Sequence, residues 1–205
     1  MFETRIHGRG GQGVVTSAEL LSVSAFREGH NAQAFPSFGS ERTGAPVVSF
    51  CRIDSRTIRT REPISEPDAV IIVDPTLLHH VDVFGGLKPD GYVLINSSRS
   101  LEELHLHDLA EGFRPERLCC VPATELAREH LGRPLPNAAM LGAFAALTGL
   151  VTLDSVAAAI RQRFVGAIGE GNVRAAQAAA ELVPPSSGKA AQEPRPMTHE
   201  EALNA

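Results

Sequence analysis

Short apolar runs and longer amphipathic stretches succeed one another along this chain. The short runs, bounded by Gly, Pro, Asp or Ser, predict strands. They cover Glu3 to His7, Asn31 to Phe35, Val47 to Ile53, Ala69 to Asp74, Tyr92 to Asn96 and Leu118 to Pro122. Apolar residues that recur every three or four positions predict helices. These cover Val14 to Glu28, Leu101 to Glu111, Thr124 to Leu131, Asn137 to Thr148, Leu153 to Phe164 and Gly171 to Leu182.

This alternation of strands and helices predicts an α/β fold. We expect a Rossmann-like three-layer domain, in which helices cover both faces of a mostly parallel sheet. A β-hairpin insertion is expected where Val47 to Ile53 turns at Asp54-Ser55 into a return strand, Thr57 to Thr60. From Asn137 onward the domain becomes helical.

Two units follow from the distribution of residue types. Residues 1–183 form the domain, and residues 184–205 form a C-terminal extension rich in proline and small polar residues. Such a composition is typical of a disordered segment, or of an arm that docks on a partner subunit.

Composition and charge exclude several classes of protein. The chain has 205 residues and a formal net charge of −5, so it lacks the basic surface that nucleic acid requires. No apolar run reaches about 18 residues, so we expect no membrane span. The N-terminus lacks the apolar core of a signal peptide, and the cysteine count of three is odd. We therefore expect a reduced, cytoplasmic protein.

A glycine loop lies between the first predicted strand and the first predicted helix. It reads Gly8, Arg9, Gly10, Gly11, Gln12, Gly13, which matches the pattern G-x-G-x-x-G. Free N–H groups at a helix start attract phosphate, and Arg9 would add a charged contact if it turned inward. An NAD site also needs an acid at the end of the second strand, but Asn31 to Phe35 contains none. The loop is thus interpreted as a phosphate site, with a purely structural turn as the alternative.

Other polar residues are open to two interpretations. A second loop carries Ser40, Glu41, Arg42 and Thr43, which suit either an anion or subunit contact or a solvated surface. Asp74 follows an apolar strand, where it would contact a ligand or cap a turn. We interpret His79-His80 and the His105 to His107 segment as surface or packing residues, and the cysteines Cys51, Cys119 and Cys120 as core.

Several signatures of self-sufficient catalysis are missing. The sequence has no CxxC motif, nucleophile elbow, Walker A motif or GDG motif, and no convincing metal cage. We assign no catalytic residue and no metal ligand to this chain.

Five segments, in order, resemble the gamma subunit of pyruvate:ferredoxin oxidoreductase and, more broadly, the gamma component of 2-oxoacid:acceptor oxidoreductases. The segments are IHGRGGQGVVTSAELLS, AFPSFGSERTGAPVVSFCRID, REPISEPDAVIIVDPTLL, VDVFGGLKPDGYVLIN and PNAAMLGAFAALTG. The resemblance covers about Thr4 to Leu182. It implies a Rossmann-like fold and a complex that oxidatively decarboxylates a 2-oxoacid, most simply pyruvate, to acyl-CoA and CO2.

The resemblance also implies a division of labour. Coenzyme A would bind this chain at the glycine loop, with the Ser40 to Thr43 loop as a second coenzyme A or subunit contact. Thiamine diphosphate, Mg²⁺ and [4Fe-4S] clusters would belong to alpha, beta and delta-type subunits, with ferredoxin as electron acceptor. The chain alone would be inactive.

Two other functions remain possible at this point. One is a mainly structural gamma-type subunit in a complex for 2-oxoisovalerate, 2-oxoglutarate or oxalate. The other is a stand-alone NAD-dependent dehydrogenase, which the missing acid disfavours.

Overall fold

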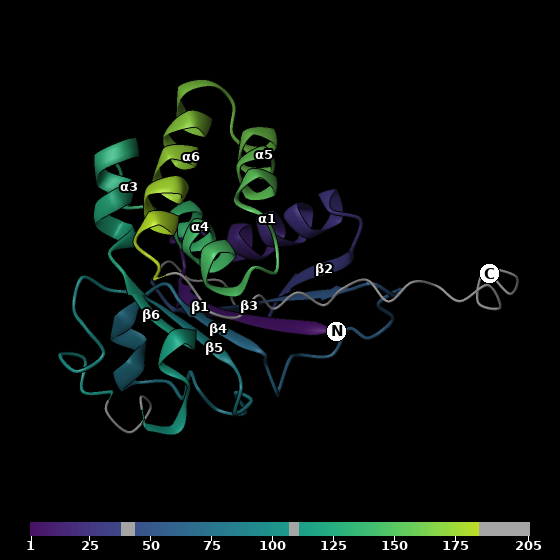
Figure 1. Ribbon diagram of the computed structural model, residues 1–205, viewed down its shortest axis with the longest axis vertical. Coiled ribbons are helices and arrows are strands. Elements are labelled where there is room, and N and C mark those ends of the chain that lie inside the picture. Colours follow the sequence, from purple (N-terminus) through teal and green to yellow (C-terminus); the bar gives the residue numbers. More distant parts are fainter. Residues whose placement is uncertain (38–43, 107–110, 185–205) are drawn as a thin grey trace, which may run out of the picture.

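A single mixed sheet of six strands organises the molecule (Figure 1). The computed structural model describes residues 1–37, 44–106 and 111–184. The strands are β1 (Phe2–Arg9), β2 (Asn31–Pro36), β3 (Pro46–Asp54), β4 (Ala69–Ile72), β5 (Tyr92–Asn96) and β6 (Leu118–Val121). The α-helices are α1 (Val14–Arg27), α3 (Ala123–Leu131), α4 (Asn137–Thr148), α5 (Leu153–Arg163) and α6 (Gly166–Glu181). Two short 3-10 helices are η1 (Pro75–His79) and η2 (Pro115–Arg117).

The strand order is β2-β3-β1-β4-β5-β6. β1, β4, β5 and β6 run parallel, whereas β3 lies antiparallel between β1 and β2. The predicted α/β fold with a mostly parallel sheet is confirmed. After β1 the chain crosses to one side of the sheet, and after β4 it proceeds to the other. The carboxyl ends of β1 and β4 therefore form a topological switch point, where open α/β sheets bind ligands.

The two faces of the sheet are covered differently. Figure 1 shows α1 and α3 to α6 gathered on one face, where they pack over Ile6, Ile71 and Leu94. The other face of β4 and β5 packs against η1 and the turns that follow it, through Leu77, Val83 and neighbouring apolar residues. In the described residues, this second covering layer consists mainly of the 3-10 helix η1 and turns. None of the described helices has the length and apolar character to cross a membrane.

Two predicted elements differ from the structure. Thr57 to Thr60 forms no strand; β3 instead pairs with β2 and β1, so the antiparallel hairpin is made by β2 and β3. Residues 101–105 form turns rather than helix, because His105 takes a φ of 57° that an α-helix cannot continue. Residues 107–110 of that predicted helix lie outside the described residues. The apolar side chains of this segment still pack as expected, with Leu104 buried.

Glycines inside helices mark close approaches rather than breaks. α6 begins at Gly166, five residues before the predicted start. A Cβ at Gly169 would overlap the carbonyl of Phe164, and one at Gly171 would come within 2.8 Å of the His130 carbonyl oxygen. Gly142 of α4 marks a third close approach, since a Cβ there would overlap the backbone of Ala176. The helical layer is therefore packed backbone against backbone at these points.

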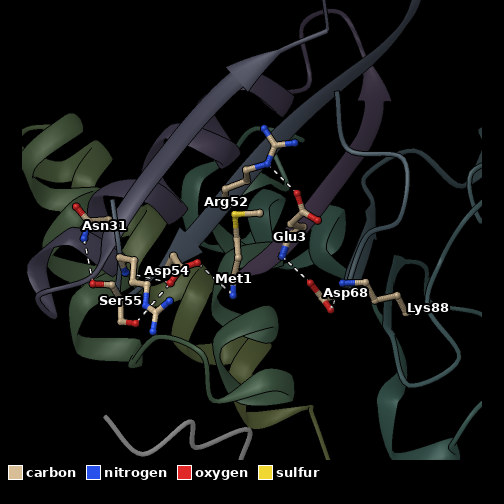
Figure 2. Close-up of polar contacts among 9 residues, drawn as sticks. Met1, Glu3, Asn31, Arg52, Asp54, Ser55, Asp68 and Lys88 are labelled. Atoms are coloured by element: carbon tan, nitrogen blue, oxygen red, sulfur yellow. Dashed lines mark hydrogen bonds and ion pairs between the residues drawn. The ribbon is translucent and has the colours of Figure 1, made fainter. Parts of the chain in front are cut away.

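A polar network fastens the amino end of β1 (Figure 2). Glu3 accepts from Arg52 Nε at 2.7 Å, and its backbone N–H donates to Asp68 at 2.8 Å. Lys88 pairs with the other oxygen of Asp68 at 2.7 Å. The network connects β3, β1 and the turn before β4 at the end of the strands that is opposite the glycine loop. It leaves the carboxyl edge free of these contacts.

His7 is an uncharged residue inside the fold. Its side chain is 4% exposed, and within the described residues neither ring nitrogen has a hydrogen-bond partner. Burial, together with the positive charge of Arg5, lowers the pKa of His7 to about 4, although Asp82 opposes this. Between this value and about 6.5 the unfolded chain binds a proton that the folded chain refuses, so stability must fall as the pH falls through that window.

We expect the free energy of unfolding to drop by about 2 kcal/mol between pH 7 and pH 5 because of His7 alone. His7→Leu should remove that part of the slope in denaturant titrations at the two pH values. His79→Gln, which changes an exposed histidine, should keep it. An unchanged slope in His7→Leu would show that His7 accepts a proton in the folded state.

Candidate functional site

The glycine loop lies at the switch point: Gly8 and Arg9 are the last two residues of β1, where they pair with Val47 and Pro46 of β3, and Gly10 to Gly13 lead into α1. Its backbone partly pairs with the chain that enters β3: Gly10 N–H donates to the Ala45 carbonyl at 3.0 Å, and Gly44 N–H to the Gly10 carbonyl at 3.2 Å. Within the described residues, the N–H groups of Gly11 and Gly13 donate no hydrogen bond. These two groups are the donors that a bound anion would need.

Each glycine in the loop has its own steric reason. A Cβ at Gly8 would press on Val14, so β1 and the start of α1 lie close together. Gly11 has a φ of 94° and faces open space. Gly13 has a φ of 76°, and a Cβ there would stand 3.0 Å from the side chain of Asn137. The third glycine thus lets the start of α1 lie against the start of α4.

A cleft of about 630 Å³ opens beside the loop. Gly11, Gly13 and Thr16 line one side of it, Asn137 begins α4, and Ala167 and Ile168 belong to the first turn of α6. The starts of α1, α4 and α6 all lack a side-chain cap. Uncapped N–H groups at three helix starts, reinforced by the helix dipoles, give this cleft a positive potential.

Cationic and apolar side chains complete the cleft. Arg133 and Arg174 are exposed at its wall, and His130 joins them. Leu131, Leu135 and Phe164 supply an apolar lining. A ligand with both anionic groups and an extended organic part suits such a mixture, because phosphates need donors while rings and alkyl chains need contact area.

Arg9 and Gln12 are turned toward the protein. The guanidinium of Arg9 donates to the Gly44 carbonyl at 3.0 Å and to Thr76 Oγ1 at 2.9 Å, and its Nε lies 3.3 Å from Asp74. Gln12 accepts from the Arg9 N–H at 2.7 Å and donates to Asp74 at 2.8 Å. These two side chains join the loop to the turn after β4.

Asp74 caps η1, one of the two roles predicted for it. It accepts from the backbone N–H of Thr76 at 2.9 Å and from its hydroxyl at 2.6 Å. Burial alone would raise the pKa of Asp74, but the hydrogen bonds from Thr76 and Gln12 and the charge of Arg9 outweigh it and hold the pKa below its ordinary value. Asp74 is therefore an ionised acceptor already supplied with donors.

The other predicted candidates are the second loop and the three cysteines. Ser40, Glu41, Arg42 and Thr43 lie outside the described residues. Cys51 and Cys119 are core residues as predicted, and burial raises the pKa of the Cys119 and Cys120 thiols to about 11. The described residues contain no cluster of three or more His, Cys, Asp or Glu side chains that would hold a metal.

Sequence reasoning missed Arg133, Arg174 and Asn137. They lie more than a hundred residues from the glycine loop, and only the packing of α3, α4 and α6 brings them to it. The one local signal is Pro136 before Asn137, which marks a helix start.

The fold is a Rossmann-like α/β domain, and a cleft opens between its glycine loop and its helical layer. Residues 3–182 match the family described as pyruvate ferredoxin/flavodoxin oxidoreductase, and the chain belongs to this family. The predicted resemblance to its gamma subunit is confirmed by the relatives described next.

The relatives share nearly their full length with this chain. It is 52% identical over 179 residues to the pyruvate/ketoisovalerate oxidoreductases common subunit gamma of Thermococcus kodakarensis, covering 87% of this chain and 95% of that one. It is 47% identical over 185 residues to the pyruvate synthase subunit PorC of Methanothermobacter thermautotrophicus, covering 89% and 96%. The crystal structure of pyruvate oxidoreductase subunit PORC from Thermotoga maritima matches with a TM-score of 0.74 and 35% identity, covering 88% and 95%.

Gly13→Ala should lower the free energy of unfolding by about 2 kcal/mol, through backbone strain and a clash with Asn137. Gly149→Ala is a matched control, because Gly149 has a φ of 62° but no atom within 4 Å of its would-be Cβ. Denaturant titrations should show a larger loss for Gly13→Ala, and Asn137→Ala should recover part of it. Equal losses of unfolding free energy in the two variants would mean that the Asn137 side chain moves away from the added Cβ without destabilising the fold.

Proposed function

We propose that this chain is the coenzyme A-binding gamma subunit of a 2-oxoacid:ferredoxin oxidoreductase. The observation that carries the proposal is the cleft, in which free glycine-loop amides, three uncapped helix starts and two arginines adjoin an apolar wall. Coenzyme A combines phosphates with an adenine ring and a long pantetheine arm. Family membership independently favours an acyl carrier over other phosphate compounds.

In this proposal the ligand's anionic end lies at the loop and its arm leads out of the cleft. Gly11 and Gly13 N–H groups donate to phosphate oxygens, while Arg133 and Arg174 neutralise the remaining charge. Leu131, Leu135 and Phe164 contact the organic part. The thiol is thereby held at a defined place for transfer of an acyl group, and orientation of this kind lowers a barrier without proton transfer by the chain.

The redox chemistry is assigned to companion subunits. Thiamine diphosphate, Mg²⁺ and [4Fe-4S] clusters belong, in this proposal, to alpha, beta and delta-type chains that pass electrons to ferredoxin. The buried thiols of this chain are protonated at neutral pH, since burial raises their pKa, which supports a role in binding rather than in chemistry. The purified chain should give no turnover with pyruvate, coenzyme A and a viologen dye.

Pyruvate is the proposed substrate of the complex, with 2-oxoisovalerate as the nearest alternative. The relative from Thermococcus kodakarensis is named as a subunit common to pyruvate and ketoisovalerate oxidoreductases. A subunit shared by two such enzymes does not select the oxoacid, so the selecting contacts are placed in partner chains. A purely structural role would leave the cleft without purpose. An NAD site is disfavoured by β3, which separates β2 from β1.

Gly11→Asp should abolish most coenzyme A binding, because its carboxylate would stand beside the phosphates and repel them. Gly11→Asn is the matched control, since it has nearly the same shape and the same backbone strain at a φ of 94°. In calorimetry on the assembled complex we expect at least a roughly tenfold weaker affinity for Gly11→Asp than for Gly11→Asn. Equal affinities would remove the loop from coenzyme A binding.

Arg133→Gln and Arg174→Gln should each raise the dissociation constant for coenzyme A roughly threefold, because each removes a charged partner of a phosphate. Binding of phosphate-free pantetheine should not change. Arg114→Gln serves as the control, since Arg114 is an exposed arginine paired with Asp90. If the two variants also bound pantetheine more weakly, these arginines would contact the thiol arm instead.

A further inference from the structure

We propose that Asp74 is a positioning residue for coenzyme A, acting through Gln12 on the shape of the glycine loop. The inference rests on the proposed function but concerns a residue that no ligand needs to touch. Asp74 follows β4, the parallel neighbour of β1, and is 8% exposed. It therefore belongs to the rigid sheet rather than to the loop it holds.

The oxygens of Asp74 are divided between two tasks. Oδ1 accepts from Thr76 N–H and from Thr76 Oγ1, which fixes the carboxylate on its own turn. Oδ2 accepts from Gln12 Nε2 at 2.8 Å and lies 3.3 Å from Arg9 Nε. With four donor groups around it, the carboxylate has no free acceptor site for a ribose hydroxyl, so a direct contact with a nucleotide is not its role.

Gln12 passes this constraint into the loop backbone. Its Nε2 is held by Asp74, which leaves Oε1 to accept from the Arg9 N–H at 2.7 Å. The Gln12 N–H also donates to the Arg9 carbonyl at 3.1 Å. The N–H and the carbonyl of Arg9 are thus both hydrogen-bonded to Gln12. The Arg9 guanidinium is in turn hydrogen-bonded to Thr76 and Gly44.

The result is a loop whose shape exists before any ligand arrives. Gly11 and Gly13 have positive φ angles, which glycine enters and leaves at little cost, so the sequence of the loop does not hold them in place. The tether from β4 supplies the missing constraint. A preformed set of donors binds an anion more tightly, because the ordering cost is met on folding rather than on binding.

The test uses a reciprocal exchange of acid and amide. Asp74→Asn places an NH2 group against Gln12 Nε2 or leaves that bond unmade, and Gln12→Glu places two carboxylates together. The double variant, Asp74→Asn with Gln12→Glu, restores one carboxylate and one amide at this contact. Its net charge equals that of the wild type, because one substitution removes a negative charge and the other adds one. Asp90→Asn, at an exposed acid paired with Arg114, controls for loss of a negative charge.

Hydrogen exchange on the full chain without coenzyme A gives the first measurement. The hydrogen-bonded amides of the loop, those of Arg9, Gly10 and Gln12, should exchange about tenfold faster in either single variant, and within about threefold of wild type in the double variant. Asp90→Asn should leave them unchanged. Unchanged exchange in both single variants would overturn the tether, whether or not coenzyme A binds this chain. Should Asp74→Asn fail to fold, Gln12→Met removes the hydrogen bond to Asp74 from the loop side, together with the bond from the Arg9 N–H.

Kinetics of the assembled complex give the second measurement. Asp74→Asn should raise the KM for coenzyme A about tenfold and leave kcat at saturating coenzyme A within about twofold, because the loop reaches the same bound shape. Faster exchange without any change in KM would overturn the positioning role while leaving the tether. Absence of coenzyme A binding to the wild-type cleft would instead count against the proposed function, and the exchange data would still decide the tether.

Discussion

A single close approach, that of Gly13 to Asn137, sets the geometry of the whole cleft. The chain must take a left-handed turn at Gly13 to enter α1, and the side chain of Asn137 occupies the space that any Cβ would need. Only glycine satisfies both conditions. Because of it the starts of α1 and α4, which have no side-chain cap within the described residues, meet beside the cleft.

The helical layer repeats this solution at a distance from the loop. At Gly142 α4 meets the backbone of α6, and at Gly171 α6 meets the end of α3. Small residues at these crossings let the helix axes come close, so α6 brings its own uncapped start and Arg174 to the cleft. The positive potential of the site is therefore a product of helix packing more than of the net charge, which is −5.

Charged and polar groups lie at both ends of the central strands and between them. Arg52 and Glu3 pair at one edge, Asp74 gathers donors at the other, and His7 lies uncharged between them on β1. In the first two arrangements each charge lies beside an oppositely charged group, while His7 avoids the cost of burying a charge by remaining neutral. A chain whose proposed task is to position a ligand gains from such a frame, since placement depends on stiffness.

Local pattern was sufficient for the strands and for most helices, because period and turn residues act within a few positions. Tyr92–Asn96 and Asn137–Thr148 have the predicted bounds, and the glycine loop leads from the first strand to α1 as predicted, although β1 continues through Gly8 and Arg9. Local pattern failed at Leu101, where turns replace the predicted helix, and at Thr57, where no strand forms. It also missed the first residues of α6, where Gly169 allows a close contact with Phe164. The tertiary structure alone decided which residues surround the loop. Arg133 and Arg174 reach it, and Arg9 turns away to Thr76, because these choices depend on which segments pack together, and a linear pattern does not contain that information.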